Sequence, residues 1–406
     1  MNARGRAAGL AANLLLSLVS LVVFVGLAEG LARGVDLRPR SSGVVANPPW
    51  LGGRWLVPSD AYRDRLADAG FLSRYYDLYE WDRFLFYRLR PGRRLEMIDP
   101  LAPPSLADHG RWLLETNARG FRGADFDSQP VSGRHRIVSL GDSSTFGWGV
   151  AVDQAYPSAL RDDVARRLGS SPDRLEVLNL GVPGYSSFQG RVMLERVALP
   201  LRPELVTWSY LSNDGAFTGQ SDRRAYERRL GWSGALLAAL HHSRAFEAFE
   251  GWFDLLSARL SGAARGTAPR TQRNVASYQE AAENVRDAVR AARAAGVKIV
   301  LVGLCLRDQG AATLAAVAAE TATPYLDATA LLDERVPRLA SDPASADVRA
   351  SAAAHYGSAA VAASPYLLAF LPDGCHPNAY GHRLVAQALA ERVAPLLGGE
   401  ARSSQR

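Results

Sequence analysis

The stretch Arg136–Gly149, RIVSLGDSSTFGWG, joins an apolar run to a glycine-rich turn and decides the fold of this chain. Its first part, Arg136–Leu140, is short, apolar and β-branched, which is typical of a core strand in a parallel sheet. The glycines at 141, 147 and 149 permit a tight turn, and the small polar residues between them suit a helix N-terminus. Because open α/β folds bind ligands at the carboxyl ends of their strands, we expect Ser143 to lie exposed at that edge.

A second informative stretch, Asp373–Asn378, reads DGCHPN and precedes a predicted helix over Ala379–Leu397. At this spacing on a turn, the carboxylate of Asp373 can reach the Nδ1 proton of His376, fix the tautomer and stabilise the imidazolium. A nucleophilic serine needs such a base. The other six histidines lie in predicted helices or lack a glycine-bounded acidic partner: His109, His135, His241, His242, His355 and His382.

Two further predicted strands run into loops that could donate hydrogen bonds to an oxyanion. Leu175–Leu180 leads into GVPGYS, whose second glycine, Gly184, lets a backbone N–H approach a ligand. Leu205–Tyr210 leads into LSND, where the side-chain amide of Asn213 could donate. Each loop is also compatible with an ordinary turn.

Taken together, these blocks resemble the SGNH subgroup of the GDSL esterase and lipase superfamily. Ser143 matches its nucleophile block, Gly184 its glycine block, Asn213 its asparagine block, and Asp373 with His376 its Asp-x-x-His block, in this order over roughly 136–397. One departure is Leu211, which stands where the family usually has a glycine two residues before the asparagine.

The resemblance implies a fold and a chemistry. The fold is a three-layer α/β/α sandwich of the SGNH-hydrolase, flavodoxin-like type, with a five-stranded parallel sheet. Ser143 would attack an ester carbonyl, His376 would act as base and then acid, and Asp373 would orient it. The backbone N–H groups of Ser143 and Gly184 and the side chain of Asn213 would hold the oxyanion, with no metal and no organic cofactor.

The alternation of patterns supports this fold independently. Apolar runs near 136–141, 175–180, 205–210, 298–303 and 324–327 predict five strands, and helical patterns lie between them. Asn274–Ala295 has helical periodicity and a glycine stop at Gly296.

The N-terminus predicts a membrane segment. Ala7–Ala28 carries no charge, and as a helix it would be about 33 Å long, enough to cross a bilayer. Arg4 and Arg6 precede it, so the amino end should stay in the cytoplasm and the rest should lie outside. A cleaved signal peptide is the alternative, because Gly26–Ala28 offers small residues at a cleavage site.

The composition of the chain argues against several other classes of function. The chain has 406 residues, 48% of them hydrophobic, and a net charge of +6 without a lysine block, which argues against nucleic-acid binding. Its two cysteines, Cys305 and Cys375, are too few for a zinc site or a disulfide framework. Cys305 follows the predicted strand Lys298–Gly303, and Cys375 adjoins His376, so both should lie near the carboxyl edge of the sheet. We hypothesise a disulfide between them, which requires an oxidising compartment.

We therefore divide the chain into an anchor or signal segment (1–40), a β-containing extension (41–133) and a hydrolase domain (134–400) with a helical insert near 215–272. In the extension, Phe84–Leu95 and Trp112–Gly120 are predicted to be strands that lead into turns. The insert carries an apolar stripe at helical spacing, which we expect to pack on the parent domain or to wall the substrate cleft. Its members are Trp232, Leu236, Leu240, Phe246, Phe249, Trp252 and Leu255.

The sequence thus predicts a membrane-anchored serine esterase outside the cytoplasm. The expected substrates are acyl or acetyl esters on cell-envelope glycans, with lysophospholipids and other lipid esters second. Two alternatives stay open: an O-acyltransferase that uses the same triad to acylate a glycan, and a non-catalytic module that binds an envelope polymer. Protein partners and oligomeric state are not predicted.

Overall fold

The computed structural model describes residues 3–35, 78–97, 111–214, 217–218, 221–249, 252, 273–274 and 276–398. The chain divides into two compact units. Residues 47–227 and 270–406 form one unit, and residues 1–46 and 228–269 form the other. The first of these contains every residue assigned to the candidate site.

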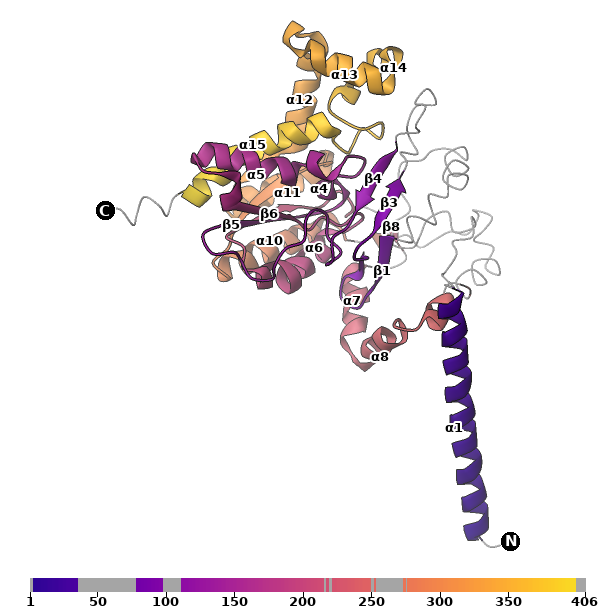
Figure 1. Ribbon diagram of the computed structural model, residues 1–406. Coiled ribbons are helices and arrows are strands. Elements are labelled where there is room, and N and C mark those ends of the chain that lie inside the picture. The colour runs from indigo at the N-terminus through magenta and orange to yellow at the C-terminus, as the bar shows by residue number, and fades with distance from the viewer. Residues whose placement is uncertain are drawn as a thin grey trace. The chain divides into compact units, whose positions relative to one another are not determined.

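A five-stranded sheet of parallel strands, in the order β11-β10-β7-β5-β6, forms the centre of the larger unit. Figure 1 shows this sheet between layers of helices. The sequence prediction of a flavodoxin-like α/β/α sandwich is confirmed. The strands lie within one residue of the predicted runs: β5 (His135–Gly141), β6 (Leu175–Asn179), β7 (Leu205–Ser209), β10 (Lys298–Gly303) and β11 (Tyr325–Asp327).

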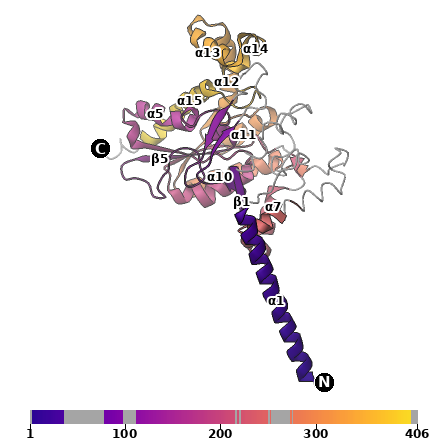
Figure 2. The ribbon, with the colours of Figure 1, turned by 45° about the vertical axis from the view of Figure 1, so that its right-hand side comes forward.

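The core lies on both faces of this sheet because successive strand residues point to opposite sides. In β10, Ile299 and Leu301 pack into one buried cluster, and Val300 and Val302 pack into the other. The first cluster includes side chains of α6 (Ser187–Met193), α10 (Tyr278–Ala294) and α11 (Asp308–Glu320). The second includes α5 (Tyr156–Leu168), α12 (Ala328–Ser341) and α15 (Ala379–Gly398). Figure 2 shows α5 and α15 on one side of the sheet and α10 on the other.

Local signals set the helix boundaries. The helix predicted from Asn274 begins at Tyr278, because Ser277 caps it: its hydroxyl accepts the N–H of Glu280, whose side chain accepts the N–H of Ser277. The final helix agrees with its prediction to within one residue. Between α12 and α15 lie two short helices, α13 (Ala346–Tyr356) and α14 (Ser358–Ala363).

The described part of the extension consists of two antiparallel strand pairs. These are β1 (Tyr79–Asp82) with β2 (Phe86–Leu89), and β3 (Arg94–Met97) with β4 (Trp112–Glu115). The strand leading into a turn that was predicted over Phe84–Leu95 corresponds to β2 and the turn at 91–92, and β3 then begins at Arg94. Residues 41–77 and 98–110 of the predicted extension lie outside the described residues.

The extension shares the core of the catalytic sheet. Tyr87 donates its hydroxyl to the carbonyl of Pro183 at 3.0 Å, and Tyr185 donates its own to the carbonyl of Tyr87 at 2.6 Å. Both tyrosines are buried and belong to the same apolar cluster as β5 and β7. The extension therefore packs directly on the loop that contains Gly184.

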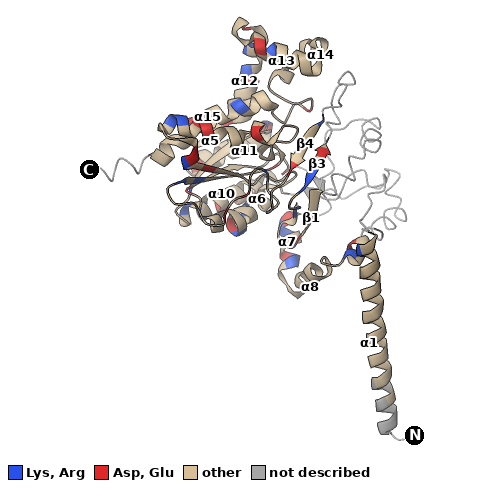
Figure 3. Cartoon of the chain, in the orientation of Figure 1, with Lys and Arg blue, Asp and Glu red and all other residues tan. Residues whose placement is uncertain are grey.

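The second unit begins with α1 (Ala3–Gly34), within which Ala12–Gly34 is long and apolar enough to span a membrane, with a mean hydropathy of 2.3. Figure 3 shows no charged residue in the middle of α1, where residues 12–28 carry none, and Glu29 and Arg33 follow near its C-terminal end. The same unit contains α8 (Trp232–Leu240), which follows α7 (Asp222–Leu230), and a helical stretch at 244–249. The short pair β8 (Phe217–Thr218) and β9 (Arg273–Asn274) joins the two ends of the insert.

The apolar stripe of the insert belongs to the second unit, and the expectation that it packs on the parent domain or walls the substrate cleft stays a prediction. Exposed side chains are Trp232, Leu236, Leu240, Phe249 and Trp252, while Phe246 is half-buried and Leu255 lies outside the described residues. The helix ends at Leu240 and a new helical stretch begins at residue 244, so the continuous helical spacing expected over the stripe is interrupted.

Candidate active site

The nucleophile candidate lies where β5 ends and α4 (Ser143–Phe146) begins. Asp142 caps this helix by accepting the N–H of Ser144 at 2.9 Å. A side chain on Gly141 would collide with Thr145 and with the carbonyl of Ser209, so only glycine permits the turn. Ser143 is only 3% exposed, and the expectation of an exposed serine is wrong in this respect. Its hydroxyl is covered because His376 lies over it.

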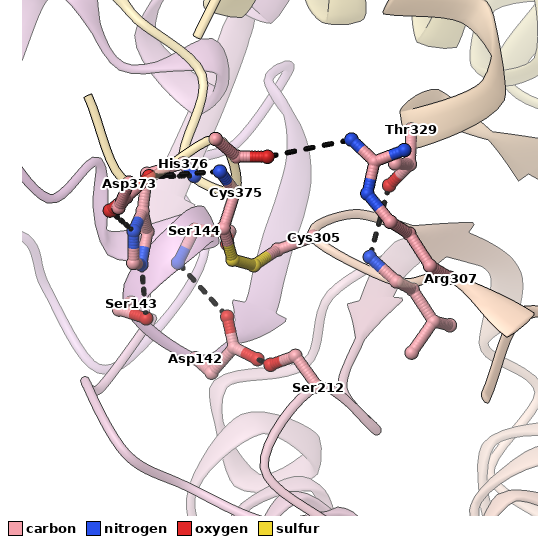
Figure 4. Close-up of a disulfide and its surroundings, with 12 residues drawn as sticks. Asp142, Ser143, Ser144, Ser212, Cys305, Arg307, Thr329, Asp373, Cys375 and His376 are labelled. Carbon is pink, nitrogen blue, oxygen red and sulfur yellow. Dashed lines mark hydrogen bonds and ion pairs between the residues drawn. A yellow bond between two sulfur atoms is a disulfide. The ribbon is translucent and has the colours of Figure 1, made fainter. Parts of the chain in front are cut away.

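The sequence-predicted Ser143, His376 and Asp373 come together across 233 residues of sequence (Figure 4). His376 Nε2 lies 2.8 Å from Ser143 Oγ, and His376 Nδ1 lies 2.5 Å from Asp373 Oδ2. The other oxygen of Asp373 accepts the backbone N–H groups of Cys375 and His376 at 2.9 Å each. This is the geometry of a nucleophile, a base and an orienting carboxylate.

The environment of Asp373 keeps its carboxyl group ionised. Burial acts to raise its pKa, but the charge of His376 and the hydrogen bonds from His376 and Cys375 outweigh burial, and the pKa is lowered from its ordinary value. With an ionised Asp373 as acceptor of the Nδ1 proton of His376, Nε2 is the unprotonated ring nitrogen, and it faces Ser143 Oγ.

A disulfide between Cys305 and Cys375 fixes the histidine loop to the segment that follows β10 (Figure 4). The Cα atoms are 4.8 Å apart, and the bond confirms the hypothesis drawn from the sequence. On the same side, Arg307 donates to the carbonyl of Gly374 at 3.4 Å and lies over the ring of Phe370. The loop of His376 is therefore held covalently and by an arginine.

The other buried histidine, His382, has a structural role. Its Nδ1 accepts the N–H of Tyr156 at 3.2 Å, and its ring stacks on that of Tyr156. Burial, together with the nearby Arg122 and His376, lowers the pKa of His382 to about 3, so it stays neutral and cannot replace His376 as a base at neutral pH.

The loop of Gly184 adopts a conformation that favours glycine. Its φ is +83°, and a Cβ there would lie 2.7 Å from the hydroxyl of Tyr87. Within the described residues, the backbone N–H groups of Ser143 and Gly184 meet no hydrogen-bond acceptor. Both are therefore free to donate to a ligand.

Asn213, the third predicted oxyanion donor, is half-buried next to these two loops. Its Nδ2 donates to the carbonyl of Tyr185 at 3.0 Å and, over a longer 3.4 Å, to Asp142 Oδ2. The amide thus links the loop after β7 to the residues that follow Gly184 and precede Ser143.

Leu211, the departure from the family pattern, has a φ of +98°. A leucine therefore holds a backbone conformation in which glycine is usual, and its side chain is 1% exposed. The change from glycine does not displace Asn213 from the site, and the strain is offset by burial of the leucine.

Two buried carboxylates near the candidate oxyanion site escaped the sequence analysis. Asp142 accepts the hydroxyl of Ser212, and Asp214 accepts the N–H of Ser187 at 2.9 Å and the hydroxyl of the same serine. Burial is the main cause that raises the pKa of each, to about 7 for Asp214. Their positions next to Ser143 and Asn213 were a usable signal, but only the fold shows that they tie the site loops together.

Arg122, also missed, supports the turn after the nucleophile. It is 2% exposed, donates to the carbonyls of Phe146, Gly147 and Val150, and lies over the ring of Phe146. Burial is the main cause that lowers its pKa, to about 9. The extension thereby reaches the catalytic turn through a buried guanidinium.

A model of the GDSL-like lipase/acylhydrolase family matches residues 139–384. Among solved structures, TesA is 17% identical, over 64% of this chain and 99% of that one, with a TM-score of 0.36. A catalytic mutant of Axe2, an acetylxylan esterase from Geobacillus stearothermophilus, is 15% identical, over 64% of this chain and 94% of that one, with a TM-score of 0.36. The psychrotrophic esterase EstA from Pseudoalteromonas sp. is 12% identical, over 65% of this chain and 98% of that one, with a TM-score of 0.37.

No curated protein matches the chain significantly. The described residues contain no group of three or more His, Cys, Asp or Glu side chains that could hold a metal ion. The family model spans more than half of the sequence and includes every predicted site residue. This chain belongs to the GDSL-like lipase/acylhydrolase family.

Proposed function

We propose that this ester-bond hydrolase is a membrane-anchored serine esterase whose catalytic domain lies outside the cytoplasm. Its family establishes hydrolysis of ester bonds. The observation that carries the catalytic assignment is the chain of hydrogen bonds from Ser143 through His376 to Asp373, at 2.8 and 2.5 Å.

In this proposal Ser143 Oγ attacks the ester carbonyl carbon while His376 Nε2 takes the serine proton. The oxyanion accepts hydrogen bonds from the N–H groups of Ser143 and Gly184 and from the side-chain amide of Asn213. To reach the oxyanion, Asn213 Nδ2 exchanges its 3.4 Å hydrogen bond to Asp142, the longer of its two, for one to the oxyanion. As the C–O bond to the alcohol breaks, His376 returns the proton to the leaving oxygen. Water then attacks the acyl-serine by the same route, releases the acid and regenerates Ser143.

The proposed location rests on α1 and on the disulfide. A helix that spans Ala12–Gly34 suits a membrane anchor, and a signal peptide is the alternative. A Cys305–Cys375 bond persists outside the reducing cytoplasm. From this location we propose acyl or acetyl esters of cell-envelope glycans as substrates, with lipid esters such as lysophospholipids second.

Acyl transfer to a glycan hydroxyl is the second candidate, and one observation favours it. Ser143 is 3% exposed and His376 is 1% exposed, so bulk water has little access to the reacting atoms. An acceptor hydroxyl bound in place of water would take the acyl group from Ser143. Product analysis with and without an acetylated or free glycan distinguishes transfer from hydrolysis.

The proposal is tested by hydrolysis of short-chain and long-chain p-nitrophenyl esters by the full chain in detergent. Ser143→Ala should lower kcat by about a thousandfold or more, because it removes the nucleophile. Ser144→Ala is the matched control, because this serine is equally buried and lies next to Ser143 but outside the chain of hydrogen bonds to His376 and Asp373. If Ser143→Ala keeps turnover within a few fold of wild type, the assignment is wrong, and the chain-length preference separates acetyl from lipid esters.

A further inference from the structure

We propose that an exposed apolar face of the insert is a second membrane contact, seated in the phospholipid headgroup region beside the end of α1. This interfacial face consists of Trp232, Leu236, Leu240 and Trp252. The inference rests on the proposed anchoring of the chain by α1 and adds to it a second surface that touches lipid.

The interfacial face has the composition of a lipid-facing surface. Trp232 is 80% exposed, Leu236 52% and Trp252 58%. Trp232, Leu236 and Leu240 are spaced by four residues and so share one side of α8. The sequence of α8, WSGALLAAL, contains no charged residue, although a helix on a water-exposed surface normally carries several.

Hydrogen bonds within the same compact unit join this segment to the end of α1. Glu29 accepts the hydroxyl of Ser243 at 2.7 Å and the N–H groups of Arg244 and Ala245 at 3.1 and 3.0 Å. Arg33 donates to Glu29 at 2.6 Å and to the carbonyl of His242 at 3.0 Å. These bonds attach the start of the 244–249 helical stretch to α1.

The attachment lies at the level where the apolar run ends. Residues 7–28 carry no charge, and Glu29 is the first charged residue after them, so Glu29 marks the boundary between acyl chains and headgroups. Leu240 lies three residues before Ser243, a reach of at most about 10 Å. Trp252 lies nine residues after Ser243, and residues 244–249 between them are helical, which shortens the span of that part of the chain. Both positions are within reach of the headgroup layer.

The chemistry of the segment fits that layer better than water or a dry protein contact. Tryptophan concentrates at membrane interfaces, where its ring is partly apolar and its N–H can reach water or headgroups. Arg228 and Arg229 shortly precede α8 in the sequence and add positive charge to this segment, which favours association with anionic phospholipids. The segment therefore combines an exposed, apolar and aromatic helix face with basic residues just before the helix, and both features suit the headgroup layer.

The test uses the full chain in liposomes of phosphatidylcholine and phosphatidylglycerol. Single cysteines replace Trp232 or Leu236 and carry the fluorophore NBD, while both native cysteines are already paired in the disulfide. Brominated lipid should remove most of the NBD emission at both positions. Ala354→Cys, exposed on α13, is the matched control and should respond to aqueous iodide instead.

Two outcomes overturn the inference. If iodide alone quenches the probes at 232 and 236, the face lies in water. If neither agent quenches them, the face lies against protein, either the parent domain or a second copy. A Leu18→Cys probe in α1 reports the anchoring separately, since Leu18 is exposed within the apolar run. If that probe also escapes brominated lipid, the proposed anchoring itself has failed. Ester hydrolysis by each labelled variant verifies that the catalytic domain is intact.

Discussion

Leu211 has a backbone conformation that leucine rarely adopts, with φ at +98°, and its side chain is nevertheless buried. A positive φ costs any residue with a Cβ on the order of 1–2 kcal/mol, and glycine avoids that cost. Truncation of a buried leucine costs about 2–5 kcal/mol whichever small residue replaces it. At this position, the packing of the leucine side chain therefore compensates for the strain of its backbone.

The Leu211→Gly variant should consequently be at least as stable as the Leu211→Ala variant. The glycine variant should be the more stable by about 1 kcal/mol, because glycine relieves the strain of the positive φ. Leu180 is the matched control, because it is fully buried and lies outside the positive-φ residues. There, the glycine variant should be less stable than the alanine variant by about 1 kcal/mol. Urea unfolding of the four variants provides the measurement. The same order of stability at both positions would contradict strain at Leu211.

The buried carboxyl group of Asp214 makes the free energy of unfolding depend on pH. Burial raises its pKa to about 7 in the folded protein, against about 4 for an unfolded chain. Between these values the folded state keeps a proton that the unfolded state has lost, so the free energy of unfolding falls as pH rises and levels off above about 7.

Asp214→Asn removes this titration and retains an oxygen that can accept the N–H of Ser187. Relative to this variant, wild type should lose up to about 4 kcal/mol of stability between pH 4 and about 7.5. Other titrating groups are common to both proteins and cancel in the difference. Thermal unfolding across this pH range tests the prediction, and parallel curves for the two proteins would refute it.

Among the elements, the segment after β10 and the loop before α15 are joined by the Cys305–Cys375 bond across a sequence separation of 70. In the chain-entropy model, a closed loop of this size stabilises the folded state by about 4 kcal/mol. The bond also fixes the residue next to His376, so its effect extends to the base.

The variant with both cysteines changed to serine should lose about 4 kcal/mol of stability. Its kcat should fall about tenfold or more, because a small displacement of a catalytic group is costly. Dithiothreitol should have a comparable effect on wild type and none on the double variant, which serves as the control. An unchanged kcat in the folded double variant would show that His376 is positioned without the disulfide.

The elements of the sheet were also the most predictable part of the fold. Each strand is a short apolar run bounded by glycine, proline or polar residues, and the five strands lie within one residue of their predicted positions. Over Phe84–Leu95 the predicted strand leads into a turn as expected, but the start of β3 at Arg94, just after that turn, was not separated from it by periodicity.

At the scale of the whole molecule, the strand order explains where the site forms. β5 lies between β6 and β7, so the chain reverses its direction of winding between β5 and β7. Open α/β sheets bind ligands at such a switch point. Ser143 follows β5, Gly184 follows β6 and Asn213 follows β7, which brings the three candidate oxyanion donors to one edge.

The sequence by itself determined the sheet, the family and the residues of the candidate site, because strand patterns and short motifs are local and the four motifs keep their order. Only the tertiary structure decided that Ser143 is covered by His376, that Asp214 and Arg122 brace the site loops, and that Trp232 and Leu236 lie exposed. Burial and long-range hydrogen bonds depend on which distant segments meet in space, and residue spacing along the chain does not encode that.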